Sequence, residues 1–246
     1  MSDPQPPAFE TLRVGIEGTL GRLTLHQPDR LNPIGSAVLG ELVEAAAWFD
    51  ATGAAAVIVS GAGRAFSAGF DLRELSGPPA DPTVRTPELG AAMAEAIAGM
   101  RAVTIAAVQG PCVGGGFVLA LCCDLRVAAD DAWFSLPEVE LGIPLAWSGV
   151  PRLVREIGPA RTTELVLTGR RVPAAEAFAM GLLNRVVAVG EQVPAAEELA
   201  GVVRSRRPEV VATTKRQVSD AAAALVPTDG EWAGTQHLVE ALRALG

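Results

Sequence analysis

The stretch VTIAAVQGPCVGGGFVLALCCDLRVAADDAWFSLPEVELGIPLAWSG, residues 103–149, decides the fold of this chain. It opens with an apolar run, Val103–Val108, which has the length of a buried strand. After a Gly-Pro turn, three consecutive glycines, Gly114–Gly116, stand directly before the apolar segment Phe117–Cys123. Glycines at a helix start let the backbone approach a ligand and leave free N–H groups aimed at it. The stretch therefore predicts a buried strand, a loop rich in N–H donors and a helix.

One carboxylate, Glu138, follows the apolar run Trp133–Leu136 and precedes a second Gly/Pro turn, Gly142–Pro144. A carboxylate held among apolar groups has a raised pKa, which makes it a better general base near neutral pH. Backbone N–H donors and one such base are the minimum needed to move a proton next to a carbonyl group. Glu140 lies two residues further on, and an extended local chain would place it on the same side as Glu138.

Composition restricts the class of protein. The chain has 246 residues, of which 49% are hydrophobic and 20% are charged, so we expect a globular protein with a sizeable core. The longest apolar stretch, 112–123, is too short to span a bilayer, and residues 1–10 lack the pattern of a secretory signal. Cytoplasm is therefore the expected location. The net charge of −8 argues against nucleic acid and against an anionic membrane surface as partners.

The chain has too few cysteines and histidines to predict a disulfide framework or a metal site. Three cysteines, Cys112, Cys122 and Cys123, lie in or beside the apolar core stretch, and no histidine follows them at a zinc-like spacing. We expect three buried thiols, with neither a disulfide framework nor a metal site. The chain has only two histidines, His26 and His237, and no tyrosine. Catalysis must then rest on carboxylates and backbone groups.

The sequence does not support three other kinds of enzyme. Gly61 and Gly63 follow a predicted strand, but Phe66 stands where the third glycine of a dinucleotide-binding fingerprint belongs. The glycine triplet is not followed by the Gly-Lys-Ser/Thr of a phosphate-binding loop. A Ser-His-Asp hydrolase is disfavoured because the histidines lie at the end of a hairpin and in a terminal helix, far from the serines. The candidate serines are Ser67, Ser135 and Ser148.

The remaining segments alternate between the two kinds of regular structure. The predicted strands are Leu12–Ile16, Leu20–Leu25, Ala56–Ser60 and Val186–Val189, of which the first two form a hairpin. The predicted helices are a segment capped by Ser36 that ends before Gly53, and then Glu88–Met100, Val150–Ile157, Ala160–Leu167, Ala174–Met180, Ala195–Arg206, Glu209–Leu225 and Glu231–Leu245. Residues 1–8 are expected to form a flexible tail, and 77–87 a flexible excursion. The pattern predicts an α/β fold with a core at 1–190 and a helical region at 191–246, which packs on that core or on neighbouring subunits.

Three motifs together resemble the crotonase (enoyl-CoA hydratase/isomerase) superfamily. They are Ala65–Leu72, Gly110–Asp124 and Pro137–Gly142, and they occur in the family's order and spacing within roughly residues 10–225. The resemblance implies a crotonase-like spiral of ββα units with a helical C-terminal trimerisation region. It also implies a homotrimer or a dimer of trimers. The expected substrate is a coenzyme A thioester of the kind met in fatty acid metabolism, with no separate cofactor and no metal.

The resemblance also assigns roles by position. The backbone N–H groups of Phe70 and Gly115 would form an oxyanion hole for a thioester enolate, and Glu138 would be the catalytic acid and base. Other residues would line the CoA and acyl sites, namely Arg30, Leu31, Ala65, Ala68, Asp71, Leu72, Gly114, Val118, Pro137, Leu141 and Gly142. Ile143 and Trp147 would complete an apolar acyl pocket.

One departure from the family pattern bears on the reaction. Hydratases of this family carry two glutamates that hold and activate water, and the first of these positions is Val118 here, while the second is Glu138. A valine neither orients nor deprotonates water, so a lone base favours moving a proton from C2 to C4, which is Δ3,Δ2-enoyl-CoA isomerisation. One alternative is an atypical enoyl-CoA hydratase that uses Glu140 or a water held by the backbone. A second alternative is a non-catalytic acyl-CoA-binding protein.

Two further features concern the rest of the site. No aspartate occupies residues 144–149, so an aspartyl nucleophile of the dehalogenase kind is not supported. The sequence ends at Gly246, soon after Leu238–Leu245, where many members of the family continue through another helical stretch that helps complete the CoA site and the subunit contacts. Lys215 and Arg216 would either face the phosphates of CoA or lie on an exposed helix face.

Overall fold

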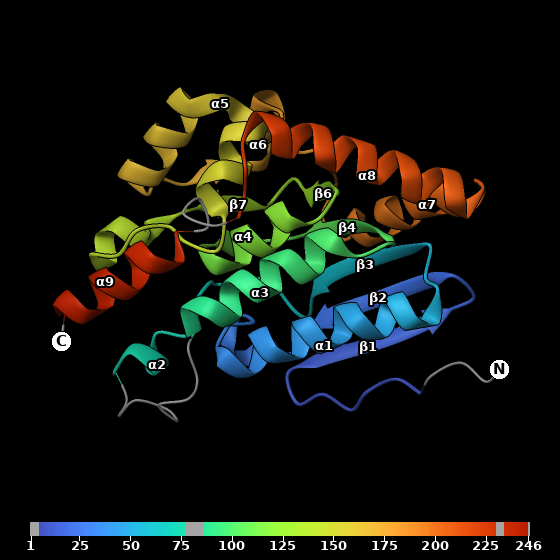
Figure 1. Ribbon diagram of the computed structural model, residues 1–246, viewed down its shortest axis with the longest axis horizontal. Helices are drawn as coiled ribbons and strands as arrows, with labels where there is room; N and C mark the ends of the chain where they lie inside the picture. Colours follow the sequence, from blue (N-terminus) through green and yellow to red (C-terminus); the bar gives the residue numbers. More distant parts are fainter. Residues whose placement is uncertain (1–4, 77–85, 230–233, 246) are drawn as a thin grey trace.

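The computed structural model describes residues 5–76, 86–229 and 234–245 (Figure 1). A six-stranded sheet has the order β1-β2-β3-β4-β6-β9, and a three-stranded sheet has the order β5-β7-β8. The strands are β1 (Leu12–Glu17), β2 (Leu20–Leu25), β3 (Ala56–Gly61), β4 (Val103–Val108), β5 (Pro111–Val113), β6 (Leu125–Ala129), β7 (Trp133–Ser135), β8 (Val172–Pro173) and β9 (Arg185–Val187). The α-helices are α1 (Ser36–Thr52), α2 (Arg73–Ser76), α3 (Thr86–Gly99), α4 (Gly115–Cys122), α5 (Gly149–Thr168), α6 (Ala174–Met180), α7 (Gln192–Arg204), α8 (Pro208–Leu225) and α9 (Thr235–Leu245). Two 3₁₀ helices are η1 (Pro28–Arg30) and η2 (Pro137–Leu141).

The central strands of the large sheet, β3, β4 and β6, are buried on both faces. Strands β1 and β2 form the predicted antiparallel hairpin, and β2, β3, β4, β6 and β9 continue it in parallel. In β3, Val57 and Val59 belong to the main core, while Ala56 and Ile58 belong to a second core on the opposite face. This alternation is expected of parallel strands that have helices on both faces of the sheet. It explains why their sequences are continuous apolar runs.

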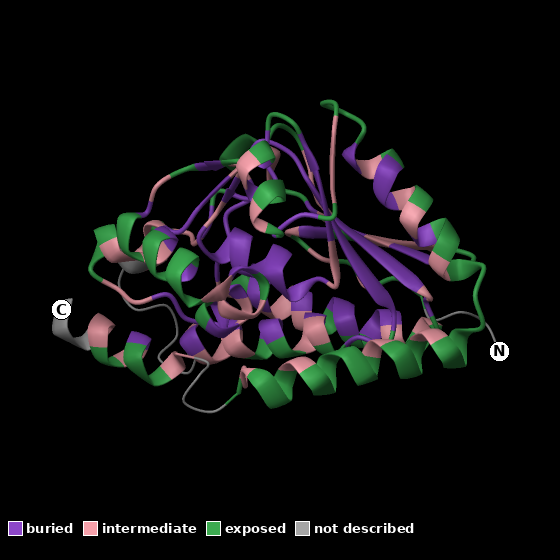
Figure 2. Cartoon of the chain, turned by 90° about the horizontal axis from the view of Figure 1, so that it is seen from above, coloured by how far each residue is buried: buried purple, intermediate pink, exposed green. Residues whose placement is uncertain are grey.

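Helices of different parts of the chain cover the two faces. Residues of α1, α3 and α4 fill the main core, and α1 packs along α3 (Figure 1). The small side chains Ala195, Ala196 and Ala200 place α7 against β3, β4 and β6 on the other face. Figure 2 shows the sheet strands buried at the centre and exposed residues along the outer helix faces. Of the described C-terminal helices, α7 and α9 contribute buried side chains to the cores of their own chain, whereas α8 has no buried residue.

The cap of α1 differs from the prediction. The N-cap is Gly35, in an extended conformation, and Ser36 is the first helical residue. The backbone N–H and the hydroxyl of Ser36 both donate to the Glu74 carboxylate, at 2.9 and 2.7 Å. A Cβ atom at residue 35 would overlap Oε1 of Glu74, so a side chain there would displace this carboxylate. The cap comes from a distant segment, which a local sequence pattern does not reveal.

Other differences are small. The two helices predicted around Gly158 and Pro159 are one continuous element, α5, interrupted at Gly158 with φ 77°. Strands β5, β6, β7 and β8 are short and were not among the predicted strands. Of the predicted flexible excursion, 77–85 lies outside the described residues, and Thr86 and Pro87 already begin α3. Of the predicted tail, 1–4 lies outside the described residues, and 5–8 has no regular structure. Among the described residues, no helix is both long and apolar enough to cross a membrane.

Candidate active site

Three segments that are distant in sequence run side by side beneath the site. Ser67 forms a parallel bridge with Cys112 of β5. Strand β5 in turn pairs in parallel with β7, where Cys112 lies opposite Phe134. Because the three segments run in the same direction, the residues that follow each pairing emerge at the same edge. Those residues are Phe70, Gly115 and Glu138.

Two glycines bring two of these segments into contact. A Cβ atom at Gly69 would lie 2.8 Å from the carbonyl oxygen of Val113 and 3.7 Å from Cα of Gly114. Both glycines have positive φ, at 93° and 51°, which side chains other than glycine rarely adopt. The close approach of Gly69 to Gly114 places the amides of the next residues, Phe70 and Gly115, beside each other.

Within the described residues, neither the Phe70 amide nor the Gly115 amide donates a hydrogen bond. Gly115 is the first residue of α4, so no intrahelical acceptor is available to it. On either side of Phe70 the amides are occupied, because Gly69 donates to a serine hydroxyl and Asp71 to a backbone carbonyl. The fold therefore presents two neighbouring N–H groups to a ligand, one of them at the positive end of a helix.

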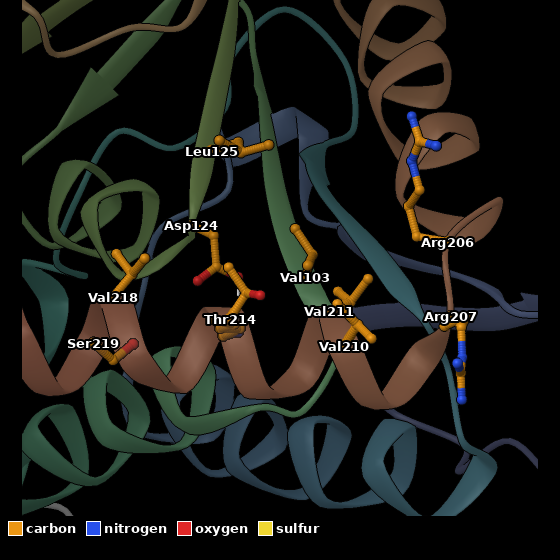
Figure 3. Close-up of a pocket in the computed structure, with 11 residues that line it drawn as sticks. Val103, Asp124, Leu125, Arg206, Arg207, Val210, Val211, Thr214, Val218 and Ser219 are labelled. Atoms are coloured by element: carbon orange, nitrogen blue, oxygen red, sulfur yellow. Dashed lines mark hydrogen bonds and ion pairs between the residues drawn. The ribbon is translucent and has the colours of Figure 1, made fainter.

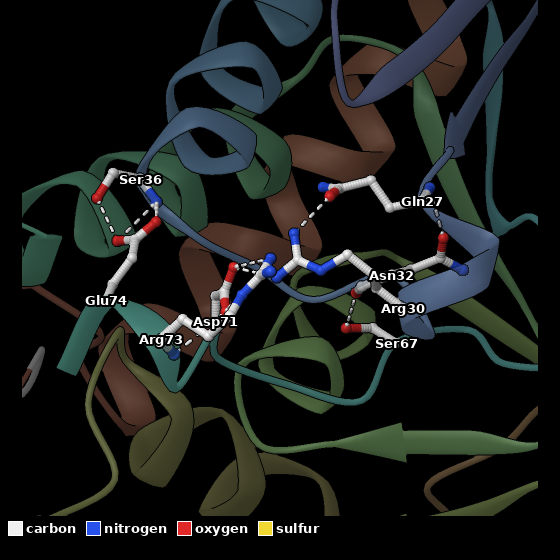
Figure 4. Close-up of polar contacts among 8 residues, drawn as sticks. All are labelled: Gln27, Arg30, Asn32, Ser36, Ser67, Asp71, Arg73 and Glu74. Atoms are coloured by element: carbon white, nitrogen blue, oxygen red, sulfur yellow. Dashed lines mark hydrogen bonds and ion pairs between the residues drawn. The ribbon is translucent and has the colours of Figure 1, made fainter. Parts of the chain in front are cut away.

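A buried asparagine holds the loop that carries Phe70 (Figure 4). Asn32 has φ 53° and is 1% exposed. Its Nδ2 donates to the carbonyl oxygens of Ala62 and Ala65, each at 2.9 Å, and its Oδ1 accepts from the Gln27 amide at 2.9 Å. Its own carbonyl accepts a bond of 2.7 Å from the hydroxyl of Ser67. A left-handed, fully bonded asparagine at this position fixes the loop from below.

Ser67 connects this loop to the helix on which Gly115 stands. Its Oγ accepts the Gly69 amide at 3.1 Å, and its backbone exchanges hydrogen bonds with Pro111 and Val113 around β5. A Cβ atom at Gly116 would lie 2.5 Å from Cβ of Ser67, so the serine side chain packs directly against α4. Ser67 thus contacts both elements that supply the free amides.

Glu138 lies opposite the amides, in η2. Pro137 begins this single turn, and Gly142 ends it with φ 74°. The Glu138 carboxylate packs against Gly114, since a Cβ atom there would lie 2.9 Å from Oε1. Its Oε2 is buried and has no hydrogen-bond partner among the described residues. Burial raises the pKa of Glu138 to about 7, against an opposing hydrogen bond from its own backbone.

Glu140 does not share this position. The expectation that it faces the same side as Glu138 is wrong, because the chain here is a 3₁₀ turn rather than a strand. Glu140 is exposed and lies against Gly169, where a Cβ atom would be 2.8 Å from its Oε1. The site therefore holds one buried carboxylate rather than a pair.

An apolar wall closes the site. The Phe70 and Trp147 rings meet edge to face, with centroids 6.2 Å apart. A Cβ atom at Gly115 would lie 2.5 Å from the Trp147 ring, so the indole covers the start of α4. Val118 is 1% exposed and lies on the next turn of α4, against Gly149. No polar side chain occupies the Val118 position.

Most of the residues predicted to line the CoA and acyl sites lie around the outer rim, while Gly114, Val118 and Ala65 are buried. Arg30 forms an ion pair of 2.5 Å with Asp71, on which Arg73 also converges (Figure 4). The Ala68 amide donates to the carbonyl of Leu31, and this residue pair joins the two rim segments. Exposed or half-buried side chains at the rim are those of Leu31, Ala68, Leu72, Pro137 and Leu141, and Gly142 is exposed with them. Ala65 is buried beneath the loop.

A groove lies elsewhere, along α8 (Figure 3). It has a volume of about 590 Å³, and its lining includes Lys215 but neither Glu138 nor the amide donors Phe70 and Gly115. Val103, Leu125, Val210, Val211 and Val218 give it apolar walls. Lys215 at its edge does not extend into solvent, because its ammonium group donates to Asp124 and to a backbone carbonyl, at 2.7 and 2.8 Å. Of the two alternatives for Lys215, neither a phosphate-facing charge nor an exposed helix face describes it.

The sequence interpretation missed the parts played by Asn32 and Ser67. Ser67 was considered only as a hydrolase nucleophile, and both of its Oγ hydrogen bonds are to the backbone. Buried polar side chains are almost always hydrogen-bonded. A polar residue within an apolar or loop segment is therefore only a weak sign that it will be buried and bonded in this way. The three cysteines are buried thiols, as predicted, and burial raises the pKa of each. Among the described residues, no cluster of His, Cys, Asp and Glu has the arrangement of a metal site.

The chain is similar to known proteins over most of its length. The family described as enoyl-CoA hydratase/isomerase matches residues 15–233. A relative from Mycobacterium tuberculosis (strain CDC 1551 / Oshkosh), named probable enoyl-CoA hydratase echA8, is 36% identical over 217 residues, which are 87% of this chain and 82% of the relative. The structure of an enoyl-CoA hydratase subunit from Geobacillus kaustophilus HTA426 has a TM-score of 0.81 at 34% identity and covers 96% of this chain and 90% of its own. A structure described as a monofunctional enoyl CoA isomerase from M. smegmatis has a TM-score of 0.74 at 29% identity, with 86% and 93% covered.

The paired segments, the two free amides and the buried glutamate thus occur in a chain whose relatives share both sequence and fold. The resemblance noted in three motifs extends over the whole family match, and the solved neighbours have the crotonase fold. The chain belongs to the enoyl-CoA hydratase/isomerase family of the crotonase superfamily.

Proposed function

We propose that the protein is a Δ3,Δ2-enoyl-CoA isomerase. The observation that carries this proposal is the single buried carboxylate, Glu138, facing two free amides with the apolar Val118 at the other wall. The thioester oxygen of the substrate would accept hydrogen bonds from the N–H groups of Phe70 and Gly115. These donors are in place before the reaction and would stabilise the negative charge of the enolate.

Glu138 would move the proton. Its pKa of about 7 means that a large fraction is ionised at neutral pH, while the acid that it forms still gives the proton back readily. The ionised carboxylate would take a proton from C2 of a 3-enoyl-CoA, and the electron pair would pass into the thioester as the dienolate. The same carboxylic acid would then protonate C4, which leaves the double bond between C2 and C3. No atom is gained or lost, so one acid-base group is sufficient.

Hydration requires polar groups that this site largely lacks. Addition of water needs groups that hold the water molecule and take its proton while C2 is protonated. Glu140 lies against Gly169 on the far side of η2, and Val118 offers no hydrogen bond. The hydratase alternative is kept because the relatives are mostly named hydratases. It would require water to be held by backbone groups and Glu138 alone.

The CoA moiety would lie along the outer rim, over Leu31 and the 68–72 loop. Arg30 and Arg73 place two guanidinium groups at this rim, where they share the Asp71 carboxylate. A pantetheine or phosphate group would compete with that carboxylate for the same donors. These two guanidinium groups would give an acyl-CoA cationic contacts, although the net charge of the whole chain is negative.

One side-by-side experiment tests the reaction. The same preparation is given 3-hexenoyl-CoA and crotonyl-CoA, with the Glu138→Gln variant and a matched Glu140→Gln control. We expect isomerisation to exceed hydration, to fall by about 10²–10⁴-fold in Glu138→Gln and to be unchanged in Glu140→Gln. Faster hydration of crotonyl-CoA would establish the hydratase instead. Binding of acyl-CoA without any turnover would establish the non-catalytic alternative.

We also infer that copies of the chain associate through α8. This helix has no buried residue, and its exposed side chains include Val210, Val218 and Leu225. An exposed apolar helix face beside an apolar groove favours a partner that covers both. Light scattering on the whole protein is expected to give the mass of a trimer or of a dimer of trimers, and a monomer at micromolar concentration would refute self-association.

A further inference from the structure

Trp147 occupies an unusual position in the backbone. It has φ 56°, and Ser148 after it has φ 61°, so two consecutive non-glycine residues adopt the left-handed conformation. Such residues cost about 1–3 kcal/mol each and persist where the surrounding structure fixes them. The Ser148 hydroxyl donates to the carbonyl of Thr228 at 2.6 Å, which holds this turn from outside. The strain places a large aromatic ring in the site.

Two glycines make room for the ring. A Cβ atom at Gly115 would lie 2.5 Å from Cζ3 in the six-membered ring of Trp147. A Cβ atom at Gly90, on α3, would lie 2.0 Å from Nε1 in the five-membered ring. The indole therefore extends from the amide-bearing start of α4 to the side of α3, with the edge of Phe70 against it. Its N–H group lies at the end of the ring that is remote from Gly115.

That N–H group has no acceptor. Trp147 is 6% exposed, and within the described residues its Nε1 is buried without a hydrogen-bond partner. A buried donor without an acceptor costs about 1–3 kcal/mol, so folded proteins retain few of them. Gln109 also has an unpartnered buried atom, but its amide nitrogen donates to the carbonyls of Gly61 and Gly63. The side chain of Trp147 has one polar atom, Nε1, and within the described residues this atom has no hydrogen-bond partner.

The site therefore contains two unsatisfied buried polar atoms of opposite kind. Oε2 of Glu138 is an acceptor beside Gly114, and Nε1 of Trp147 is a donor beyond Gly115. Under the proposed function, the first atom meets the proton at C2 and C4 of the acyl group. The second atom lies against Gly90 of α3, at the end of the indole remote from Gly115. An acyl group that continues along the indole past Gly115 would reach it, and a plain hydrocarbon chain offers no acceptor there.

We propose that the indole N–H of Trp147 binds an oxygen atom on the distal part of the acyl chain, so that the preferred substrates are oxygenated acyl-CoA thioesters rather than simple fatty acyl-CoA thioesters. This inference rests on the proposed function, because it takes the acyl group to lie between Phe70, Gly115 and Glu138. A hydroxyl or carbonyl oxygen would satisfy the donor. A methylene at the same place would leave it unsatisfied, and a site with an unsatisfied donor discriminates against such a ligand.

Calorimetric titration tests this without requiring turnover. The unmodified protein is titrated with hexanoyl-CoA and with hexanoyl-CoA derivatives that carry a hydroxyl at C4, C5 or C6. We expect at least one hydroxylated thioester to bind about tenfold more tightly than hexanoyl-CoA, which corresponds to one satisfied buried hydrogen bond. In Trp147→Phe, which keeps an aromatic ring and removes the N–H, this preference should disappear. Trp48→Phe, at a buried tryptophan of α1 that packs on Phe49, is the matched control and should keep it.

The possible results separate the two proposals. Equal affinity for all four thioesters, or a preference that survives in Trp147→Phe, would overturn the role of Trp147 and leave the isomerase proposal intact. Absence of binding by every thioester would overturn the proposed function itself. Equal affinity in the unmodified protein is enough to overturn the inference, so it stays falsifiable even when Trp147→Phe does not fold.

Discussion

The hydroxyl of Ser67 accepts the amide of Gly69 at 3.1 Å, one residue before the free amide of Phe70. The same hydroxyl donates to the carbonyl of Asn32 at 2.7 Å, while the serine Cβ packs against Gly116. One buried side chain therefore sets the distance between the loop of Phe70 and the helix of Gly115. In the proposed reaction this distance decides whether both amides reach one oxygen.

Replacing Ser67 by alanine should lower kcat by about 10–100-fold with little change in KM, because a misplacement of about 1 Å in a donor has an effect of this size. It should also reduce the free energy of unfolding by about 1–3 kcal/mol, since the Gly69 amide is left unsatisfied. Isomerase kinetics and urea unfolding measure the two effects. Thr162→Val is the control, because its buried hydroxyl bonds to the Gly158 carbonyl far from the site. An equal loss of kcat in both variants would mean that Ser67 acts only through stability.

The pH dependence of the reaction should report the Glu138 carboxyl. Its pKa is about 7 because it is buried, and the ionised form is the base. We expect kcat/KM to rise about tenfold per pH unit below pH 7 and to level off above it. Initial rates with 3-hexenoyl-CoA between pH 5 and 9 measure this profile. A profile that is flat from pH 5 to 8 would show that another group carries the proton.

Glu138 should also make the folded protein less stable as pH rises. The pKa of its carboxyl is raised in the folded state from 4.5 to about 7, so the favourable contribution is fully present below about pH 4.5 and lost as pH rises through about 7. Glu138→Gln carries no such charge and should be more stable than the unmodified protein above pH 7, by at most about 3 kcal/mol. Thermal unfolding from pH 4 to 8 measures the difference. A difference that is constant across this range would contradict the buried, ionisable state of Glu138.

Gly114 should tolerate no side chain. Its φ of 51° disfavours other residues, and a Cβ atom would lie 2.9 Å from Oε1 of Glu138. Gly114→Ala is expected to reduce the free energy of unfolding by about 1–3 kcal/mol and to displace the carboxylate, with loss of isomerase activity. Gly15→Ala is the matched control, because a Cβ atom in that strand meets nothing within 4 Å. Urea unfolding and the isomerase assay on both variants distinguish the two positions.

The strands and helices that could be predicted are those whose signal is local. Ala56–Ser60 and Val103–Val108 are apolar because both sheet faces are buried, and this leaves an uninterrupted run in the sequence. The helix ends at Gly53 and Gly181 were also visible, since each adopts the left-handed conformation that ends a helix. These elements could be predicted because each signal lies within a few neighbouring residues.

The parts that could not be predicted depend on distant partners. Strand β5 is three residues long and exists because it pairs with β7 on one side and with Ser67 on the other. The cap of α1 comes from Glu74, and nothing near Ser36 indicates it. The placement of Glu140 depended on the conformation of residues 137–141, and a proline followed by acidic and apolar residues is compatible with either a strand or a 3₁₀ turn. The resemblance supplied the positions of Phe70, Gly115 and Glu138, but not the network that holds them.

The two donors proposed to bind the thioester oxygen belong to the main chain, and this has an evolutionary consequence. Exchange of the Phe70 side chain for another leaves its N–H in place, so descendants of this chain are free to vary the lining at that point and acquire new substrates. The constraint falls instead on the residues just before the two donors, Gly69 and Gly114, whose missing side chains allow the two segments to touch. A comparison of variants should therefore find that position 70 tolerates substitution, whereas Gly69 and Gly114 do not.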